Sequence, residues 1–548
     1  MSLFAADKLS VSLGGRQIVH ELSLHVEPGE ILALVGESGS GKSTTILAML
    51  DLLPIGAHVS GEISLHGKPL PIGDDRQMCR IRGKEIGFVS QEPMSALNPL
   101  MTIGDQVAEV LRQHCAMSRS DARARSAEIL ERVAMPTAKF PLGRYPHELS
   151  GGQRQRVAIA MAIAASPKVL LADEPTTALD VTTQAKMLQL LKSLVAENQM
   201  GLILVTHDLG VVAQVADRVA IMRAGELVEE GEALDIFDHM KHPYSRRLFE
   251  ATRHCPVREP FRGQRHEPVL KASSIVRRYR GDRLSIFRRS PDHIAVNGVS
   301  FDLGRGEIVG IVGESGSGKS TLLRTLLAFD EPQAGTVTIE GQPFSASRDT
   351  SEMRRNRQRI QAVFQDPKDS FDPRWRVDRI IAEPLSLLGQ QVQSGERQKK
   401  VSTVLERVGL SAADGQRYPH EFSGGERQRI AIARALIVEP SIIAFDEPVS
   451  ALDVSIRAQI LDLLVALSAN SGMAYLFVSH DLSVIRSIAD RILIMRGGEI
   501  VEEGFTREIF EAPAHAYTRE LIAATPVIDE ALKHRRATLE AHKRSNPE

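Results

Sequence analysis

The sequence has few cysteines, no long hydrophobic run and almost no net charge. Its three cysteines, Cys79, Cys115 and Cys255, match neither a metal-binding nor a disulfide spacing, which suits a reducing cytoplasm. No apolar run approaches the roughly 18 residues that a membrane-spanning helix needs, and residues 1–10 lack the pattern of a signal peptide. We therefore expect a chain that neither crosses a membrane nor is exported.

The charge balance and the length limit the function class further. A formal net charge of −2, with 25% of residues charged, provides no basic field for nucleic acid, so we expect no nucleic-acid partner. A chain of 548 residues is also too long for a single hydrophobic core, so several domains are expected.

A repeat sets the number of domains. The ten residues VGESGSGKST at Val35–Thr44 occur again, unchanged, at Val312–Thr321. Later landmarks recur at nearly the same offset, so the second half of the chain is a copy of the first and two domains are predicted. Both copies fit the phosphate-loop pattern G-x-x-x-x-G-K-[ST]. Each follows an apolar run typical of a buried strand and precedes a predicted helix, residues 44–53 and 321–329.

The loop composition indicates phosphate binding. Glycines let successive backbone N–H groups point inward at the positive end of a helix dipole. Lys42 and Lys319 can then reach the β and γ phosphates of a nucleotide, and the hydroxyls of Ser43 and Ser320 can ligate Mg²⁺. The alternative is a glycine turn that only starts a helix, and two identical copies argue against it. The predicted loop residues are Gly36, Glu37, Ser38, Gly39, Ser40, Gly41, Lys42, Ser43 and Thr44, and Gly313, Glu314, Ser315, Gly316, Ser317, Gly318, Lys319, Ser320 and Thr321.

Each half continues with the same order of features. Alternating apolar residues near its start predict short antiparallel strands. Residues 102–134 and 377–409 have helical spacing and predict a small helical insertion. A glutamine follows a predicted strand in each half, Gln91 in SQEPMSALNP and Gln365 in FQDPKDSFDP. Both can ligate Mg²⁺, and an ordinary polar loop residue is the alternative.

Each helical insertion ends in a second glycine-rich loop that starts a helix, LSGGQRQ in the first half and FSGGERQ in the second. A hydroxyl and exposed N–H groups at a helix N-terminus form an anion site. Because the phosphate loop serves the nucleotide of its own half, this second surface is free for a nucleotide held elsewhere. Its residues are Ser150, Gly151, Gly152 and Gln153, and Ser423, Gly424, Gly425 and Glu426.

Two carboxylates and a histidine then follow apolar strands. VLLADEP and IIAFDEP end in the pairs Asp173–Glu174 and Asp446–Glu447. The aspartates suit Mg²⁺ coordination through water, and the glutamates suit polarising an attacking water as general bases. His207 and His480 end the next predicted strand, where a histidine can contact the γ phosphate and fix the glutamate. A strand-end histidine is more often structural, but its recurrence behind a complete phosphate site favours the catalytic interpretation.

In this order the motifs resemble those of the nucleotide-binding subunits of ABC transporters, over nearly the full chain. The Walker A loop, Gln loop, SGGQ-type signature, Walker B pair, D-loop and switch histidine are all present twice. The D-loops would be Ala178-Leu179-Asp180 and Ala451-Leu452-Asp453. The resemblance implies an α/β fold of two tandem P-loop ABC-type nucleotide-binding domains, each a RecA-like core with an antiparallel β-subdomain and a helical subdomain. It also implies an ATPase with ATP and Mg²⁺ as cofactors.

The resemblance further implies an intramolecular head-to-tail dimer, in which each ATP lies between the Walker A loop of one half and the signature of the other. Both sites are expected to hydrolyse ATP. The expected catalytic residues are Glu174, Glu447, His207 and His480. The expected metal ligands are Ser43, Gln91, Asp173, Ser320, Gln365 and Asp446.

Two residues depart from the family pattern. The family usually stacks an aromatic ring on adenine near the start of each half. Tyr279 fits this role in the second half, whereas Leu13 stands at the matching position of the first, so adenine stacking is expected to be weaker there. The second signature has Glu426 in place of glutamine, which we expect to matter little because the serine and glycines make most of the phosphate contact.

The Gln-loop sequences, with HPYSRRL at 242–248 and HAYTREL at 515–521, look like the oligopeptide, dipeptide and nickel importer subfamily. This resemblance implies a motor for peptide uptake on the cytoplasmic face of the inner membrane. Its expected partners are two integral-membrane permease subunits and, indirectly, a periplasmic solute-binding protein. The alternatives are a soluble tandem ATPase acting on the ribosome, which the short linker and near-neutral charge disfavour, and an exporter ATPase. The cargo itself stays open, because the ATPase does not contact it.

The expected domain boundaries are 1–252, a linker at 253–268, 269–528, and a charged tail at 529–548 that is a frayed helix or disordered. The arginine-rich stretch 277–289 is open to two interpretations, a contact with anionic lipid or a solvated insertion.

Overall fold

The computed structural model contains two compact units. Unit 1 comprises Met1–Thr252 and Pro526–Glu548, and unit 2 comprises Arg253–Thr525. The structure describes residues 2–91, 96–176, 179–258, 268–280, 292–345, 350–365, 367, 370–387, 393–450 and 452–545. The D-loop alanines Ala178 and Ala451, and much of the predicted linker and of the arginine-rich stretch, lie outside the described residues.

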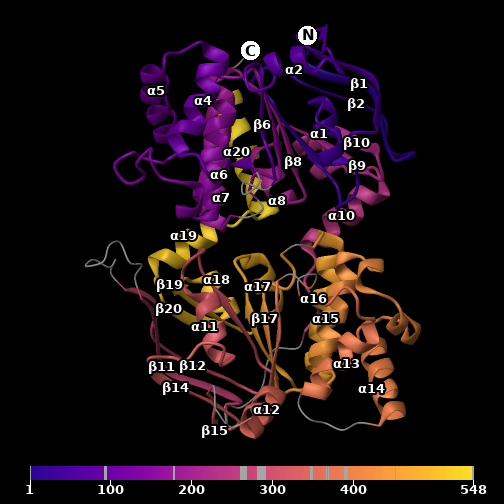
Figure 1. Ribbon diagram of the computed structural model, residues 1–548, viewed down its shortest axis with the longest axis vertical. Helices are drawn as coiled ribbons and strands as arrows, with labels where there is room; N and C mark the ends of the chain where they lie inside the picture. Colours follow the sequence, from indigo (N-terminus) through magenta and orange to yellow (C-terminus); the bar gives the residue numbers. More distant parts are fainter. Residues whose placement is uncertain are drawn as a thin grey trace. The chain divides into compact units, whose positions relative to one another are not determined.

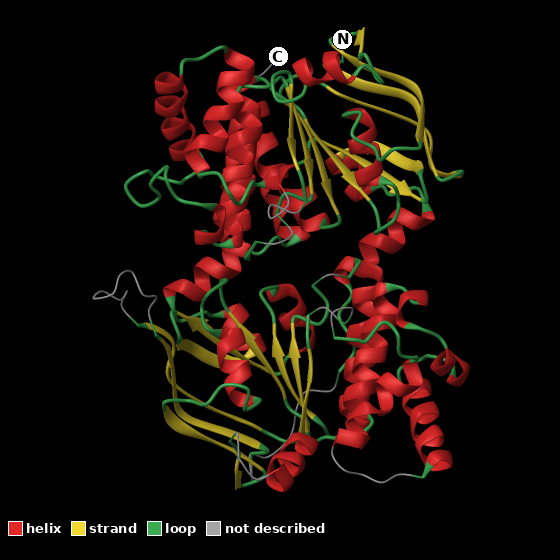
Figure 2. Cartoon of the chain, in the orientation of Figure 1, coloured by secondary structure: helices red, strands yellow, loops and turns green. Residues whose placement is uncertain are grey.

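A six-stranded sheet with the order β10-β9-β3-β8-β7-β6 forms the centre of unit 1 (Figures 1 and 2). Its strands are β3 (Ile31–Val35), β6 (Ile86–Val89), β7 (Val169–Asp173), β8 (Gly201–Thr206), β9 (Arg218–Arg223) and β10 (Glu226–Glu232). All neighbours pair in parallel except β10, which is antiparallel to β9. Every residue of β3, β7 and β8 is buried, as in a parallel sheet that is covered on both faces.

This strand order explains why the predicted site residues meet. The phosphate loop follows β3, His207 follows β8, Asp173 ends β7, and Gln91 lies two residues beyond β6. Because β3, β8, β7 and β6 are consecutive parallel strands, their carboxyl ends lie along one edge of the sheet, where ligands bind in α/β folds.

An antiparallel sheet of order β2-β1-β4-β5 packs on the other side of the phosphate-loop helix. Its strands are β1 (Phe4–Leu13), β2 (Arg16–Val26), β4 (Ala57–Leu65) and β5 (Lys68–Pro69). The alternating apolar residues of β1 and β2 face the core, which they share with α1 (Lys42–Met49). The predicted antiparallel subdomain is therefore confirmed.

The helical insertion of unit 1 is also confirmed. Its helices are α4 (Ile103–Cys115) and α5 (Arg119–Arg132), within the predicted residues 102–134. The other described helices of unit 1, besides α1, are α2 (Asp75–Ile81), η1 (Pro146–Glu148), α6 (Gly151–Ile163), α7 (Val181–Asn198), α8 (Leu209–Val215), α9 (Ala233–Asp238), α10 (Pro243–Arg253) and α20 (Ile528–Ser545). An apolar cluster joins α4, α5, α6 and α7 to the sheet. None of the helices in the described part of the chain is long and apolar enough to cross a bilayer.

Unit 2 repeats this architecture with the same strand order, β20-β19-β13-β18-β17-β16, and a second antiparallel sheet, β12-β11-β14-β15. Its strands are β11 (Leu270–Tyr279), β12 (His293–Leu303), β13 (Ile308–Val312), β14 (Ala334–Ile339), β15 (Gln342–Pro343), β16 (Ile360–Val363), β17 (Ile442–Asp446), β18 (Ala474–Val478), β19 (Arg491–Arg496) and β20 (Glu499–Phe505). Its helices are α11 (Lys319–Leu326), α12 (Thr350–Arg359), α13 (Val377–Leu387), α14 (Ser394–Arg407), η2 (Ala412–Gln416), η3 (Pro419–Glu421), α15 (Gly424–Leu436), α16 (Val454–Ser471), α17 (Leu482–Ile488), α18 (Thr506–Glu511) and α19 (Ala516–Ala524).

The two phosphate-loop helices differ slightly from the predicted ranges. Both begin at the loop lysine, two residues earlier than expected, because the preceding glycine caps the helix in a left-handed conformation. Both end earlier than expected, since Asp51 (φ 54°) and Ala328 (φ 53°) leave the helical conformation.

The C-terminal helix α20 belongs to unit 1 and is not a separate tail. The sequence predicted a separate charged tail from residue 529, either a frayed helix or disordered; the segment is a helix, α20, and it packs on α8 as part of unit 1 (Figure 1). Arg535 of α20 hydrogen-bonds to the backbone oxygen of Ala216 and lies 3.4 Å from Asp217 Oδ1. Ile528 and Leu532 of α20 are buried, and sequence patterning could not assign them a partner.

A matching contact occurs in unit 2. Arg258, which follows α10 in the chain, lies 2.8 Å from Asp490 Oδ2. Asp490 corresponds to Asp217, and each aspartate also accepts the N–H of the first residue of its phosphate-loop strand, at 2.9 and 3.0 Å. The chain therefore passes between the units twice, and each C-terminal segment contacts the same corner of a nucleotide-binding fold.

Candidate nucleotide sites

Each phosphate loop requires glycine at two points. Gly41, directly before α1, has a φ of 101°, which other residues rarely adopt. A Cβ on Gly36 would lie 2.3 Å from the carbonyl oxygen of Met222, a distance that only a backbone movement could relieve. In the second loop Gly318 has a φ of 103°, and a Cβ on Gly313 would lie 2.2 Å from another backbone carbonyl. The loop pattern is therefore set by close backbone packing.

The loop lysines are buried and bent back over their loops. Lys42 Nζ donates to the carbonyl oxygens of Gly36 at 2.8 Å and Glu37 at 2.9 Å. Lys319 makes the same two bonds in the second loop, at 2.7 and 2.9 Å. The ammonium group thus lies inside the curve of the loop, where the sequence predicted a phosphate contact.

Two tyrosines that sequence reasoning did not assign to the site also reach the loops. Tyr244 of α10 accepts the backbone N–H of Glu37 at 3.1 Å through its hydroxyl. Tyr517 of α19 accepts the N–H of Glu314 at 3.0 Å. The signal in the sequence is that both tyrosines recur in the related segments HPYSRRL and HAYTREL.

Two of the predicted metal ligands, Ser43 and Asp173, lie side by side at the first phosphate loop. The hydroxyl of Ser43 lies beside the Asp173 carboxylate, whose buried Oδ1 has no hydrogen-bond partner among the described residues. Burial raises the pKa of Asp173, as does the neighbouring Glu174, whereas Ser43 and Lys42 oppose the shift. Burial likewise raises the pKa of Asp446. A buried carboxylate oxygen beside a serine hydroxyl is a donor set suited to Mg²⁺, because a bound cation offsets the cost of burying the charge.

In the first site, the Glu174 carboxylate contacts both His207 and Gln91. Its φ is 45°, a strained conformation that its N–H helps to hold by donating to Val205 O at 3.0 Å. His207 Nδ1 lies 3.0 Å from Glu174 Oε1, and Gln91 Nε2 donates to Oε2 at 3.0 Å. The structure thus brings the predicted base, switch histidine and Gln-loop residue together.

The second site has the same histidine contact but a different glutamine contact. Glu447 has a φ of 49°, and His480 Nδ1 lies 2.9 Å from its Oε1. Gln365 Nε2 instead donates to Ser450 Oγ at 3.4 Å, and Ser450 bonds the carbonyl oxygen of Glu447 at 3.1 Å. The Gln loops of the two halves therefore meet their Walker B segments in different ways.

The histidine and glutamate of the second site stabilise each other's charge. Burial tends to raise the pKa of Glu447, but the bond and charge of His480, with Lys319, hold this pKa below its usual value. Burial tends to lower the pKa of His480, but Glu447 and then Asp481 raise it above its usual value. The pair is therefore favoured as carboxylate and imidazolium.

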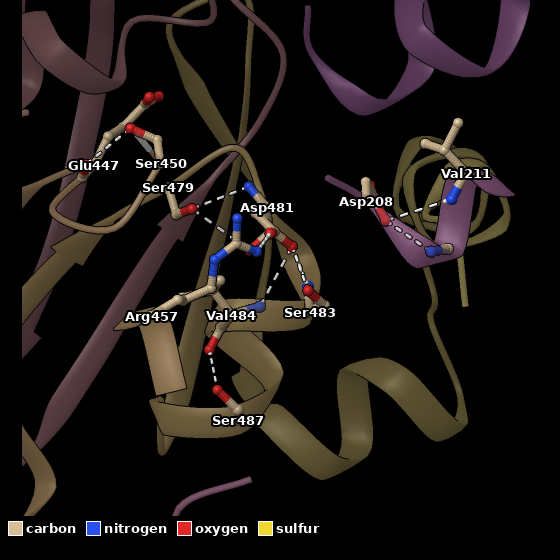
Figure 3. A network of polar contacts seen from close by, with 11 residues as sticks. Asp208, Val211, Glu447, Ser450, Arg457, Ser479, Asp481, Ser483, Val484 and Ser487 are labelled. Carbon is tan, nitrogen blue, oxygen red and sulfur yellow. Dashed lines mark hydrogen bonds and ion pairs between the residues drawn. The ribbon is translucent and has the colours of Figure 1, made fainter. Parts of the chain in front are cut away.

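Asp481 orders the loop after this histidine (Figure 3). Its carboxylate accepts Arg457 Nη1 at 3.0 Å and the backbone N–H groups of Ser483 and Val484 at 2.9 and 3.4 Å. Burial tends to raise the pKa of Asp481, but Arg457 and these donors lower it. The start of α17 is thereby fixed directly behind His480. Asp208 caps α8 in the same way in unit 1 (Figure 3).

The two signature loops start helices as predicted, with one difference. Ser150 and Gln153 cap α6 reciprocally, Ser150 N donating to Gln153 Oε1 at 3.1 Å. Ser423 and Glu426 form the same capping box on α15, but here the serine hydroxyl also donates to Glu426 Oε2 at 2.8 Å. In the second signature, the carboxylate of Glu426 therefore accepts hydrogen bonds from both the backbone N–H and the hydroxyl of Ser423.

The predicted adenine residues lie at equivalent places. Leu13 ends β1 and Tyr279 ends β11, each in a strand of ten residues. The Tyr279 ring is 37% exposed, packs beside Arg277, and donates its hydroxyl to Asp330 at 3.3 Å. A partly exposed ring at this position can accept a stacked base.

Comparison with known families agrees with this geometry. The family described as ABC transporter matches residues 19–177 and 296–450. The family described as oligopeptide/dipeptide transporter, C-terminal region, matches residues 228–269 and 501–547.

Related proteins extend over nearly the full chain. The glutathione import ATP-binding protein GsiA of Salmonella typhimurium is 46% identical, covering 95% of this chain and 88% of that protein. The peptidoglycan transport ATP-binding protein YejF of Agrobacterium fabrum is 46% identical, covering 92% of each. Among solved structures, a dimeric ATP-binding cassette bound to ADP and phosphate is 31% identical, covering 43% of this chain and 99% of that chain, with a TM-score of 0.39.

The two matched regions contain the phosphate loops, signatures and carboxylates described above, and the relatives cover nearly the whole chain. The chain therefore belongs to the ABC transporter family, as an ATPase with two ATP-binding cassettes in one polypeptide.

Proposed function

We propose that this chain is the ATP-hydrolysing motor of an ABC importer for peptides or peptide-like solutes. It would act at the cytoplasmic face of the inner membrane, on two permease subunits, with a periplasmic solute-binding protein delivering the cargo. The observation that carries the proposal is the pair of C-terminal regions of the oligopeptide/dipeptide transporter type, one after each cassette. The names of the relatives, which import glutathione and transport peptidoglycan, support a peptide-like cargo.

In the proposed sites ATP lies on one phosphate loop and is completed by the signature of the other half. Ser43, Gln91 and Asp173 would hold Mg²⁺ in one site, and Ser320, Gln365 and Asp446 would hold it in the other. When bound, the ion supplies charge neutralisation for the β and γ phosphates. The unpartnered, buried Asp173 Oδ1 supports this assignment.

Hydrolysis then depends on the residues at the strand ends. Glu174 and Glu447 would take a proton from water as it attacks the γ phosphorus, while the bond to the β–γ bridging oxygen breaks and ADP leaves. The histidine holds the glutamate through the 3.0 or 2.9 Å contact and can donate its other ring N–H toward the γ phosphate. Lys42 and Lys319 would move from the loop carbonyls to the phosphates.

A groove in unit 2 supplies a docking surface for a permease. It has a volume of about 520 Å³ and lies between the sheet edge and α13, next to Gln365. Phe329, Phe364 and Leu387 line it and are 49%, 39% and 64% exposed, and Arg434 adds a cation. Exposed aromatic rings suit the binding of a cytoplasmic helix of a permease. Because Gln365, a proposed Mg²⁺ ligand, lies next to the groove, binding of this helix would depend on the nucleotide state.

The first half has a different surface at this place. Ser90 precedes Gln91, where Phe364 precedes Gln365, and Leu52 stands where unit 2 has Phe329. The aromatic pair Phe329 and Phe364, with ring centroids 6.2 Å apart, is therefore specific to the second half. This difference supports two non-identical permease subunits rather than two copies of one.

The proposal is tested by affinity purification of the tagged chain from its native membranes in a mild detergent. Two different polytopic membrane proteins should be recovered in equal amounts. A Phe364→Ser variant, which copies the first half, should lose one of them, whereas a Ser90→Phe variant should retain both or lose the other. Recovery of ribosomal components, with no membrane protein, would contradict the importer function.

A further inference from the structure

The first peptide bond of each phosphate loop is held at both ends. The Gly36 carbonyl oxygen accepts Lys42 Nζ at 2.8 Å, and the Glu37 N–H donates to the Tyr244 hydroxyl at 3.1 Å. These two groups belong to the same planar peptide unit and point in opposite directions. Two bonds from opposite sides therefore prevent this peptide from rotating.

The second loop repeats the arrangement. The Gly313 carbonyl accepts Lys319 Nζ at 2.7 Å, and the Glu314 N–H donates to the Tyr517 hydroxyl at 3.0 Å. Tyr244 and Glu37 are 207 positions apart, and Tyr517 and Glu314 are 203 apart. The same long-range contact is thus present in both copies of the cassette.

Each tyrosine is buried and has an arginine over its ring. Tyr244 and Tyr517 are 4% and 2% exposed. The guanidinium of Arg223 lies 5.3 Å from the Tyr244 ring centroid, and that of Arg496 lies 4.7 Å from the Tyr517 ring centroid. The hydroxyl position is therefore determined by packing, so it is available to orient the loop without further ordering cost.

The backbone of each tyrosine is tied to the last strand of its sheet. The Tyr244 N–H donates to His242 Nδ1 at 3.2 Å, and the His242 N–H donates to the carboxylate of Glu229 on β10 at 3.2 Å. Tyr517 is bound through His515 to Glu502 on β20 in the same way, at 3.1 Å for each bond. The H-P-Y and H-A-Y turns thus form a relay of hydrogen bonds from the C-terminal region to the phosphate loop.

We propose that Tyr244 and Tyr517 are positioning residues for ATP binding, which fix the first peptide of each phosphate loop. The C-terminal region of each half is then a structural part of that half's nucleotide site. This inference depends on ATP binding by the two cassettes and not on the cargo or the permease. Its failure would leave the importer proposal untouched, because the test needs neither.

The test uses the full purified chain with Tyr244→Phe and Tyr517→Phe, singly and together. Phenylalanine keeps the ring beside the arginine and removes only the hydroxyl, so the loop N–H loses its acceptor. Losing one hydrogen bond from a preorganised loop should raise the Kd for ATP about 3- to 10-fold at the affected site. Hydrogen–deuterium exchange of the peptide that contains Glu37 or Glu314 should become faster in the nucleotide-free protein.

Tyr475→Phe is the matched control. Tyr475 is fully buried in β18 of unit 2, and its hydroxyl has no hydrogen-bond partner among the described residues. This variant should bind ATP as the unchanged protein does. If the Tyr244 and Tyr517 variants melt at a lower temperature but bind ATP with unchanged Kd and unchanged loop exchange, the tyrosines only pack the fold and the proposal is wrong. An effect confined to one variant would refute the proposal for the other half.

Discussion

His207 Nδ1 lies 3.0 Å from Glu174 Oε1, and these residues are separated by 33 positions in the sequence. His480 and Glu447 have the same separation and lie 2.9 Å apart. Both glutamates also adopt a left-handed backbone conformation, with φ of 45° and 49°. The same contact and the same backbone conformation thus occur in both halves, as the proposed hydrolytic pair of each site requires.

Replacing both glutamates should stop hydrolysis without preventing ATP binding. Glu174→Gln with Glu447→Gln keeps the side-chain volume but removes the base, so kcat should fall by about 10²–10⁴-fold. Steady-state ATPase assays and equilibrium binding of a fluorescent ATP analogue would measure the two effects. Glu439→Gln is the control, because Glu439 is exposed and has a similar φ of 52°. Unchanged kcat in the double variant would refute the general-base role.

The stability contributed by His480 should depend on pH. Its pKa is raised in the folded protein by Glu447, so this contribution is complete below the unfolded value of about 6.5 and is lost as pH rises through the higher folded value. The difference in unfolding free energy between the unchanged protein and His480→Gln should therefore shrink above about pH 6.5. Denaturant titrations across this range measure it. A difference that grows with pH would contradict the assigned charge pair.

The two signature loops should respond oppositely to exchanging their fourth residue. Glu426 Oε2 accepts a hydrogen bond from the Ser423 hydroxyl at 2.8 Å and places a negative charge beside the proposed phosphate contact. Glu426→Gln should lower the Kd for ATP at the site completed by this loop, and Gln153→Glu should raise it at the other, each by about 3- to 10-fold. Calorimetric titration would resolve the two sites. If both variants bind ATP with the Kd values of the unchanged protein, this prediction is wrong and the exchange of Gln for Glu matters little, as the sequence analysis expected.

Removing the Arg535 contact should destabilise unit 1 specifically. Arg535 bonds the backbone at Ala216 and lies near Asp217, which in turn anchors Ile31 at the start of β3. Arg535→Ala should cost about 1 kcal/mol, allowing for the partial exposure of the pair, and lower the melting temperature of unit 1 by about 2–4 °C. Lys533→Ala, at an exposed position of the same helix, is the control for calorimetry. Equal melting of the two variants would show that α20 is not held by Arg535.

Much of the fold and of the site could be predicted because the functional residues form short sequence motifs that occur in the same order in each half. The loop glycines, Asp173, Glu174 and His207 each end or follow an apolar strand, and parallel strands place such residues along one edge. The pairing of Glu174 with His207 was therefore expected from position alone. The different contacts of Gln91 and Gln365 were not, since they depend on side-chain geometry within the loops SQEPMSALNP and FQDPKDSFDP.

Other features depend on tertiary contacts that leave no periodic signal. The tyrosine hydroxyls reach the loop N–H groups across more than 200 positions, and nothing in HPYSRRL indicates that partner. The docking of α20 on α8 was missed because its charged sequence resembles a solvated tail, although Ile528 and Leu532 are 5% exposed. In both cases the residues were visible in the sequence and their partners were not.

The central claim is that ATP hydrolysis by this chain drives inward transport of peptides. The most direct test is uptake of labelled short peptides into vesicles that contain the copurified permease subunits, with the chain and ATP on the cytoplasmic side and the solute-binding protein on the other. The account predicts uptake that requires ATP and disappears with Glu174→Gln and Glu447→Gln. Peptide movement in the opposite direction, or uptake that persists in the double variant, would contradict it.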